Sequence, residues 1–170
     1  GEAVTLGADL GDAAACERLV DDTVAAFGAL DVVVNSAAVM LRTPVGEVRA
    51  TEWDAMFALN LRAPFFVSQR AAPHLARSKG AIVNIADLAA YETWPAYVPH
   101  GISKAGVVQM TRALARALAP DVRVNAVAPG AVLLPDDWDG SAADRLVATT
   151  PLARLGAPDD IVQAVLYLLA

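Results

Sequence analysis

The chain has 170 residues, of which 56% are hydrophobic, and a formal net charge of −6. This length allows one domain with a substantial core, and the high apolar fraction favours strands buried on both faces. The acidic balance, with no basic patch, argues against a nucleic-acid surface. No apolar run approaches the ~20 residues of a membrane span, and the single cysteine, Cys16, allows no internal disulfide. These features predict a cytoplasmic α/β domain with no nucleic-acid or membrane partner.

Apolar periodicity and helix-terminating residues predict alternating strands and helices. Strands are expected at 3–6, 30–35, 81–86 and 122–127, and helices at 12–27, 51–75, 99–118, 141–149 and from 158 onward. Asp12 and Thr51 are the expected N-caps of the first two helices, and Pro64 is expected to kink or divide the second. Residues 131–140 are expected to form a loop, with 135–138 facing the surface. The alternation predicts parallel βαβ units in a doubly wound α/β sheet.

Polar or turn-forming residues follow three of the predicted strands. Asn35 ends one strand, Asp87 follows the next, and Pro129-Gly130 follows the strand at 122–127. Ligands of open parallel sheets bind beyond the carboxyl ends of the strands. The site is therefore expected where these residues converge.

Asp87, His100 and Lys104 are the candidate catalytic groups. His100 and Lys104 are four residues apart, so they share one face of a helix. Taken singly, Asp87 can be a capping residue, Lys104 a solvated lysine and His100 a helix-start residue. Together they bring an anion, a cation and a proton donor to one rim. The carboxylate favours imidazolium and the ammonium disfavours it, so the histidine could exchange a proton near neutral pH.

Two other polar residues each have two interpretations. Asn60 lies inside a predicted helix, where asparagine is a poor helix former, so it either bonds a group in the site or is solvated. Tyr97 is a second candidate proton donor, although packing against Trp94 is the favoured interpretation.

Four motifs, in the correct order and spacing, resemble the short-chain dehydrogenase/reductase family over nearly the whole chain. They are Asn35-Ser36-Ala37-Ala38, similar to the family's Asn-Asn-Ala-Gly; Leu59-Asn60-Leu61, similar to its Val-Asn-Leu helix; His100-Gly-Ile-Ser-Lys104-Ala, in the frame of its Tyr-x-x-x-Lys; and the Arg123 to Gly130 stretch, similar to Arg-Val-Asn-x-x-x-Pro-Gly.

The sequence also departs from the family pattern. Asp87 stands where the family has its catalytic serine, a substitution typical of the pteridine reductase branch. His100 replaces the tyrosine that exchanges the proton, and Met40 occupies a position where some pteridine reductases place an aromatic ring. After Pro-Gly, 132–134 is Val-Leu-Leu rather than the usual threonine.

The resemblance implies a single partial domain over residues 1–170. The family's first strand and its glycine-rich Thr-Gly-x-x-x-Gly-x-Gly turn, which holds a pyrophosphate, have no counterpart here, nor does its last strand. In the family strand order 3-2-1-4-5-6-7, the strand at 3–6 is third and the one ending at Asn35 is fourth. We therefore expect this segment alone to leave a gap beside the fourth strand and to bind cofactor poorly.

The activity that the resemblance implies is that of an NADP(H)-dependent reductase, with NAD(H) as the alternative, delivering hydride to a carbonyl or a pterin ring. His100 is implied as the proton donor and Asp87 as the group that orients it. Lys104 would hold the nicotinamide ribose and tune the donor, and Asn60 would position Lys104 through a water.

Cofactor contacts and assembly follow from the same resemblance. The implied cofactor-binding residues are Asn35, Ala37, Lys104, Pro129 and Gly130, with Asp9 and Leu10 near the adenine. No metal site is predicted. The helices at 51–75 and 99–118 correspond to those that pair subunits in the family, which implies a homodimer or homotetramer acting on a small molecule. Because the tyrosine is replaced, a relative that binds cofactor or forms oligomers without turnover is the alternative, and a reductase of a ketone or sugar is a third.

Overall fold

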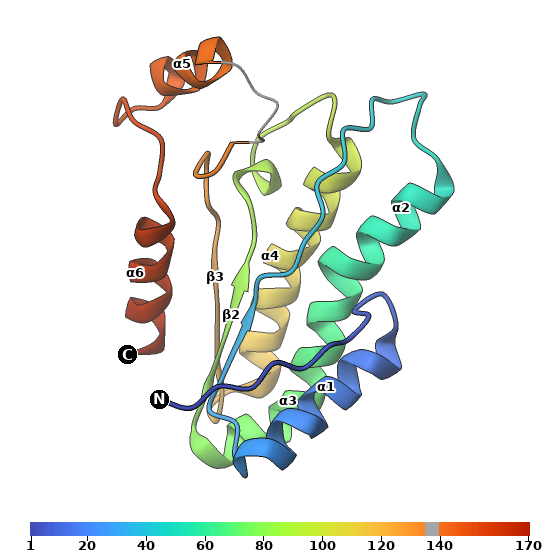
Figure 1. Ribbon diagram of the computed structural model, residues 1–170, viewed down its shortest axis with the longest axis vertical. Coiled ribbons are helices and arrows are strands. Elements are labelled where there is room, and N and C mark those ends of the chain that lie inside the picture. The colour runs from blue at the N-terminus through green and yellow to red at the C-terminus, as the bar shows by residue number, and fades with distance from the viewer. Residues whose placement is uncertain (135–139) are drawn as a thin grey trace.

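The computed structural model describes residues 1–134 and 140–170, whose arrangement is shown in Figure 1. The helices are α1 (Ala13–Phe27), α2 (Ala50–Phe57), the π-helix η1 (Ala58–Arg62), α3 (Ala63–Ser78), the 3-10 turn η2 (Leu88–Ala90), α4 (Val98–Leu118), α5 (Gly140–Thr149) and α6 (Pro158–Leu169). The strands are β1 (Val32–Asn35), β2 (Ala81–Ile85) and β3 (Arg123–Val127). Strands alternate with helices as predicted.

The three strands form one parallel sheet in the order β1-β2-β3. Helices α3 and α4 pack on one face of this sheet, and α6 lies on the opposite side, against β2 and β3 (Figure 1). Consecutive parallel strands separated by helices confirm the predicted α/β class. All three strands run toward the same edge, so the residues that follow them meet there.

The apolar core fills the space between the first halves of the strands and the helices. Its buried members are Val20, Val33, Ala71, Leu75, Ile82, Val122 and Val124. Val33, Ile82 and Val124 are each the second residue of their strand, and Val33 pairs with Ile82 as Ile82 pairs with Val124. Non-directional burial of such side chains is the main stabilising contribution.

Helix α1 begins and ends as the sequence predicts. The Asp12 side chain accepts a hydrogen bond from the Ala14 N–H at 3.0 Å, and Gly28 ends the helix at a φ of 76°. The prediction that Thr51 caps the second helix is wrong, because Arg49 is the N-cap of α2. The Glu52 carboxylate reaches back to the Arg49 N–H at 3.3 Å, which leaves Thr51 within the first turn.

The long second helix is divided close to the expected place. The π-helix η1 separates α2 from α3, and Pro64, which cannot donate a backbone hydrogen bond to the preceding turn, follows at the start of α3. Helix α3 then continues to Ser78, beyond the expected end at 75.

Two strand predictions need correction. Residues 3–6 form no strand and Val4 is 50% exposed, because an extended segment becomes a strand only beside a partner, and none of the described strands pairs with it. The strand predicted at 30–35 begins at Val32. Helices α5 and α6 lie where expected, residues 131–134 are irregular, and the surface prediction for 135–138 lies outside the described residues.

Candidate active site

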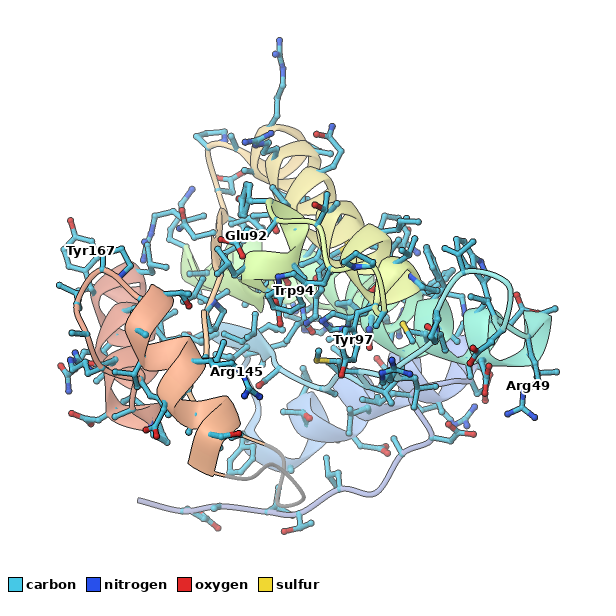
Figure 2. The ribbon with its side chains drawn as sticks, turned by 90° about the horizontal axis from the view of Figure 1, so that it is seen from above. Arg49, Glu92, Trp94, Tyr97, Arg145 and Tyr167 are labelled. Carbon is cyan, nitrogen blue, oxygen red and sulfur yellow. The ribbon has the colours of Figure 1, made fainter. Side chains whose placement is uncertain are left out.

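The candidate site lies at the edge of the sheet where the strands end. The loops after β2 and β3 are joined there by the Leu88 N–H, which donates to the Pro129 carbonyl at 2.9 Å. Figure 2 looks down on this edge, with Trp94 and Tyr97 near its middle and Arg145 extending from α5. The rings of Trp94 and Tyr97 pack edge to face with their centroids 6.4 Å apart, which confirms that Tyr97 packs against Trp94.

His100 is buried at the start of α4, where only 2% of the residue is exposed. Its Nε2 lies 3.4 Å from Asp87 Oδ2, and its Nδ1 lies 3.3 Å from the Val39 carbonyl oxygen. The predicted histidine–carboxylate contact is therefore present, together with a backbone partner on the other ring nitrogen. The imidazole is held at both ends.

Asp87 caps η2 and also faces His100. Its Oδ1 accepts a hydrogen bond from the Ala89 N–H at 2.8 Å, which caps η2, while its Oδ2 faces His100. Burial acts to raise the pKa of the carboxyl. The hydrogen bonds from His100 and Ala89, with the charges of His100 and Lys104, hold that pKa below its ordinary value.

Lys104 lies one turn after His100 on α4 and is 5% exposed. Its Nζ donates to the Ile85 carbonyl at the end of β2, at 2.9 Å. Burial lowers the pKa of this ammonium, and the Asp87 carboxylate opposes that effect. The solvated-lysine interpretation is excluded, because desolvation is the dominant influence on the group.

Asn60 is buried in the π-helix, a distortion that is frequent at functional sites. Its Oδ1 accepts from the Val39 N–H at 2.8 Å, and its Nδ2 donates to the Val39 carbonyl at 2.9 Å and to Ser103 Oγ at 3.1 Å. Both amide protons are thus used within the protein. The Asn60 side chain can therefore bind a linking water only through the remaining lone pair of Oδ1.

Asn35 points its side chain into the protein. Its Nδ2 donates to Asn84 Oδ1 at 2.8 Å and to Ser68 Oγ at 3.2 Å, which ties β1 to β2 and α3. Asn35 also lines a cavity of about 150 Å³ together with Leu10, Ala37, Asn60 and Lys104. The structure therefore brings these five predicted residues together.

The remaining predicted cofactor residues lie around this group or apart from it. Pro129 and Gly130 follow β3 beside the Asp87 loop. Asp9 lies apart: it accepts the Gly11 N–H at 2.9 Å and lines a separate hollow of about 930 Å³ that helices α2, α3 and α4 border.

Sequence reasoning missed two residues of the site. Val39 contributes only its backbone, and a backbone contact leaves no signal in side-chain chemistry. Ser103 accepts from Asn60 and donates to the His100 carbonyl at 2.7 Å. Its spacing of three residues from His100 and its place beside Lys104 in the Ser-Lys-Ala motif were the available signals.

The chemistry of these residues suits a nucleotide cofactor. The Lys104 ammonium has three N–H donors and uses one in its hydrogen bond to the Ile85 carbonyl. Two therefore remain to bind hydroxyl oxygens of a ligand at the end of β2. The small residues Ser36 and Ala37 line the same cavity and permit close approach. In residues 1–134 and 140–170, no three metal-ligating side chains lie close enough to hold a metal ion. No helix in this described part is long and apolar enough to cross a membrane.

Comparisons with known proteins place these features in context. The model of a family described as enoyl-(acyl carrier protein) reductase matches residues 1–170. The chain is 37% identical, over 98% of its length, to a protein named as ketoacyl reductase 2 of the granaticin polyketide synthase of Streptomyces violaceoruber. It is 32% identical, over 89% of its length, to a 3-oxoacyl-acyl-carrier-protein reductase of Thermotoga maritima.

A solved structure has the same fold as this chain. The crystal structure of a protein named as a short-chain alcohol dehydrogenase from Sinorhizobium meliloti 1021 matches 98% of the chain, with a TM-score of 0.92 and 34% identity. The chain spans 70%, 63% and 69% of the lengths of these three proteins, respectively. It therefore corresponds to about two thirds of each.

Proposed function

Because the chain belongs to the short-chain dehydrogenase/reductase family, we propose that the complete protein is an NADP(H)-dependent oxidoreductase that reduces a carbonyl group to an alcohol. One observation carries this proposal: a buried lysine with unused donors lies one helical turn from a histidine–aspartate pair, at the ends of parallel strands. The two relatives named as ketoacyl reductases support a keto group as the substrate.

The residues of the site have distinct roles in this proposal. When bound, the cofactor supplies a hydride. Lys104 would hold the nicotinamide ribose through its free N–H groups, and its positive charge would favour negative charge developing on the substrate oxygen. The His100–Asp87 pair would supply the proton that this oxygen needs. Asn60 holds the Val39 segment against the histidine and would position Lys104 through a water.

The cavity beside Lys104 is the proposed place of the cofactor. Asn35 and Ala37 would line it, Pro129 and Gly130 would close it on the side of β3, and Leu10 would lie toward the adenine, whereas Asp9 lines the separate hollow. The lining of the 150 Å³ cavity supports Leu10, Asn35 and Ala37 in this role. The preference for NADP(H) over NAD(H) is proposed from the resemblance to the pteridine reductase branch.

A pterin ring is the second candidate substrate. The observation that favours it is Asp87 at the family's serine position, the feature shared with pteridine reductases. The carboxylate is partly exposed, and a pterin offers ring N–H groups that such an acceptor can bind. Met40, 47% exposed, would lie beside the ring instead of an aromatic residue.

We also propose that the protein is a cytoplasmic homodimer or homotetramer paired through α2, α3 and α4. Trp53 and Phe57 stack at 4.4 Å on α2, and Trp53 and Phe65 are more than one third exposed. The 930 Å³ hollow between these helices is lined largely by apolar residues, a surface that pairing would remove from water.

The test measures oxidation of NADPH and of NADH by the complete protein with a 3-oxoacyl thioester and with a dihydropterin. The His100→Gln variant should lose at least ~100-fold in kcat, the usual size of acid–base contributions. The matched control is His74→Gln, which changes a histidine on α3 and should retain activity within a factor of ~2.

The results distinguish a keto substrate, a pterin substrate and cofactor binding without catalysis. Turnover of the thioester alone supports the keto substrate, and turnover of the pterin alone supports the second candidate. If neither substrate turns over while calorimetry shows bound NADPH, the proposal fails in favour of a relative that binds cofactor without catalysis. Turnover that survives in His100→Gln would remove the histidine from the proposed chemistry.

A further inference from the structure

His100 lies between a backbone carbonyl and the Asp87 carboxylate, which in its ionised form can only accept hydrogen bonds. Nδ1 is 3.3 Å from a backbone carbonyl oxygen, and Nε2 is 3.4 Å from an Asp87 carboxylate oxygen. Neutral imidazole has one N–H and one lone pair, so one of these contacts would set a lone pair against an oxygen. Both contacts become hydrogen bonds only when both ring nitrogens carry protons. The geometry therefore provides one acceptor for each N–H group of an imidazolium.

The two protons of this imidazolium are not equivalent. The carbonyl that faces Nδ1 belongs to Val39, whose N–H and C=O are both bonded by the Asn60 amide at 2.8 and 2.9 Å. That carbonyl is fixed in place, so Nδ1 keeps its proton and donates it to the carbonyl oxygen whatever happens at the other nitrogen. The proton on Nε2, which faces Asp87, is the one that can leave.

Burial decides which group the substrate can touch. The His100 side chain is 3% exposed, whereas the Asp87 side chain is 25% exposed. A substrate oxygen that enters from solvent can therefore contact the carboxyl group, while the imidazole lies behind it. Proton transfer to a substrate requires hydrogen-bond reach, either directly or through one intermediate group.

We propose that Asp87 is the group that passes the proton to the substrate oxygen, and that His100 is its buried source. This inference rests on the proposed reductase function. The Nε2–H bond breaks as an O–H bond forms on Asp87 Oδ2. That O–H bond then breaks as the substrate oxygen, whose carbon has received the hydride, becomes a hydroxyl. His100 is left neutral with its proton on Nδ1, and water restores the second proton through Asp87.

The other charged group at this pair is Lys104, from the same helix as His100. Its ammonium is held by the Ile85 carbonyl and interacts with Asp87. This positive charge helps to hold the pKa of Asp87 below its ordinary value, so a proton that reaches the carboxylate is readily passed on to the substrate oxygen. Asn60 is a positioning residue in this scheme, since it reaches His100 only through Val39.

The first experiment reads the protons directly and needs no turnover. In the complete protein labelled with ¹⁵N-histidine, the ring signals that disappear in His100→Gln belong to His100. At neutral pH both of its nitrogens should be protonated, and in Asp87→Asn only Nδ1 should be, because the asparagine amide can donate to Nε2. A single protonated nitrogen in the wild type would overturn the proposal.

The second experiment is kinetic. Asp87→Asn and His100→Gln should each lower kcat at least ~100-fold with KM within a factor of ~3, while His74→Gln remains active. Full turnover in Asp87→Asn with loss in His100→Gln would make the histidine the direct donor and overturn the inference. Loss in Asp87→Asn with full turnover in His100→Gln would remove the histidine as source.

The two experiments distinguish failure of the proposed reductase function from failure of the proposed proton relay. If the wild type reduces neither substrate class, the proposed function fails, and the nitrogen signals still decide whether His100 holds two protons against Asp87 and Val39. If turnover is present and His100 has one proton, the function stands and the relay is overturned.

Discussion

The two ends of the parallel sheet bury different kinds of side chain. Where the strands begin, the core is apolar, with Leu75 of α3 and Ile82 of β2 fully buried. Where the strands end, Asn60, His100 and Lys104 are just as buried, but each is polar and hydrogen-bonded. Among the described residues, no buried side-chain nitrogen or oxygen lacks a partner.

This difference teaches how one fold divides its tasks. Apolar burial stabilises without directional demands, so the first end can hold the fold together. Buried polar groups stabilise little even when paired and are costly when a partner is lost. The second end therefore contributes chemistry and adds little stability. Substitutions at the apolar end should mainly lower stability, and those at the polar end should mainly lower activity.

The largest effect is expected at the apolar end. Leu75→Ala removes a fully buried side chain from the core and should lower the free energy of unfolding by about 2–5 kcal/mol. The matched control is Leu152→Ala, a residue 76% exposed, which should change stability by less than ~0.5 kcal/mol. Urea unfolding of the complete protein measures both. Equal, small losses would mean that Leu75 does not anchor this core.

A smaller loss of stability is expected at the polar end. Asn60→Ala leaves the Val39 N–H without its partner and removes one donor each from the Val39 carbonyl and the Ser103 hydroxyl, at a cost of about 1–3 kcal/mol. Asn60→Asp keeps the side-chain volume but sets a carboxylate oxygen against the Val39 carbonyl. It should therefore lower the free energy of unfolding at least as much as Asn60→Ala does.

The Asp variant is also the control for packing. If Asn60→Asp unfolds at the same urea concentration as the wild type, the amide protons are unimportant and only the volume of Asn60 matters. In both variants we expect kcat to fall more than KM rises, because the residue orients His100 through Val39 and touches no substrate.

Local sequence signals predicted the fold well wherever a few adjacent residues decide the outcome. Asp12 and Gly28 bound α1 as expected, because a cap and a left-handed residue act within one turn. Thr51 misled, since the Glu52 side chain that reaches back to Arg49 moved the helix start. The segment 3–6 misled because a strand depends on a partner far away in sequence.

The candidate site was predictable in its side chains but not in its backbone. The four-residue spacing of His100 and Lys104, and Asp87 at a strand end, follow from periodicity. Asn60 had two equal interpretations, and the deciding contact is with the backbone of Val39, which has no chemical signature of its own. Long-range backbone contacts depend on how the loop after β1 meets η1, and only the folded chain fixes that.

The smallest effect has the opposite sign and tests the cost of the polar end. Lys104→Met replaces a buried ammonium with an apolar side chain of similar length but leaves the Ile85 carbonyl without its donor. Because desolvation is the largest influence on the ammonium, we expect its relief to exceed the cost of that lost hydrogen bond, so the free energy of unfolding should rise by about 0.5–1 kcal/mol at pH 7, while NADPH binding weakens. The other lysine, Lys79, is exposed beside Asp121, and Lys79→Met should change neither property appreciably.

The stability difference between Lys104→Met and the wild type should also depend on pH. The pKa of Lys104 is lowered in the folded protein, so between that value and its ordinary value of 10.5 the unfolded chain binds more protons than the folded one. The contribution of Lys104 to the free energy of unfolding of the wild type therefore rises with pH across that interval. The excess stability of Lys104→Met over the wild type should shrink as pH is raised from 7 to 10. If Lys104→Met is less stable than the wild type at every pH, the Ile85 hydrogen bond and the Asp87 charge outweigh desolvation, and the polar end stabilises the fold as well as supplying its chemistry.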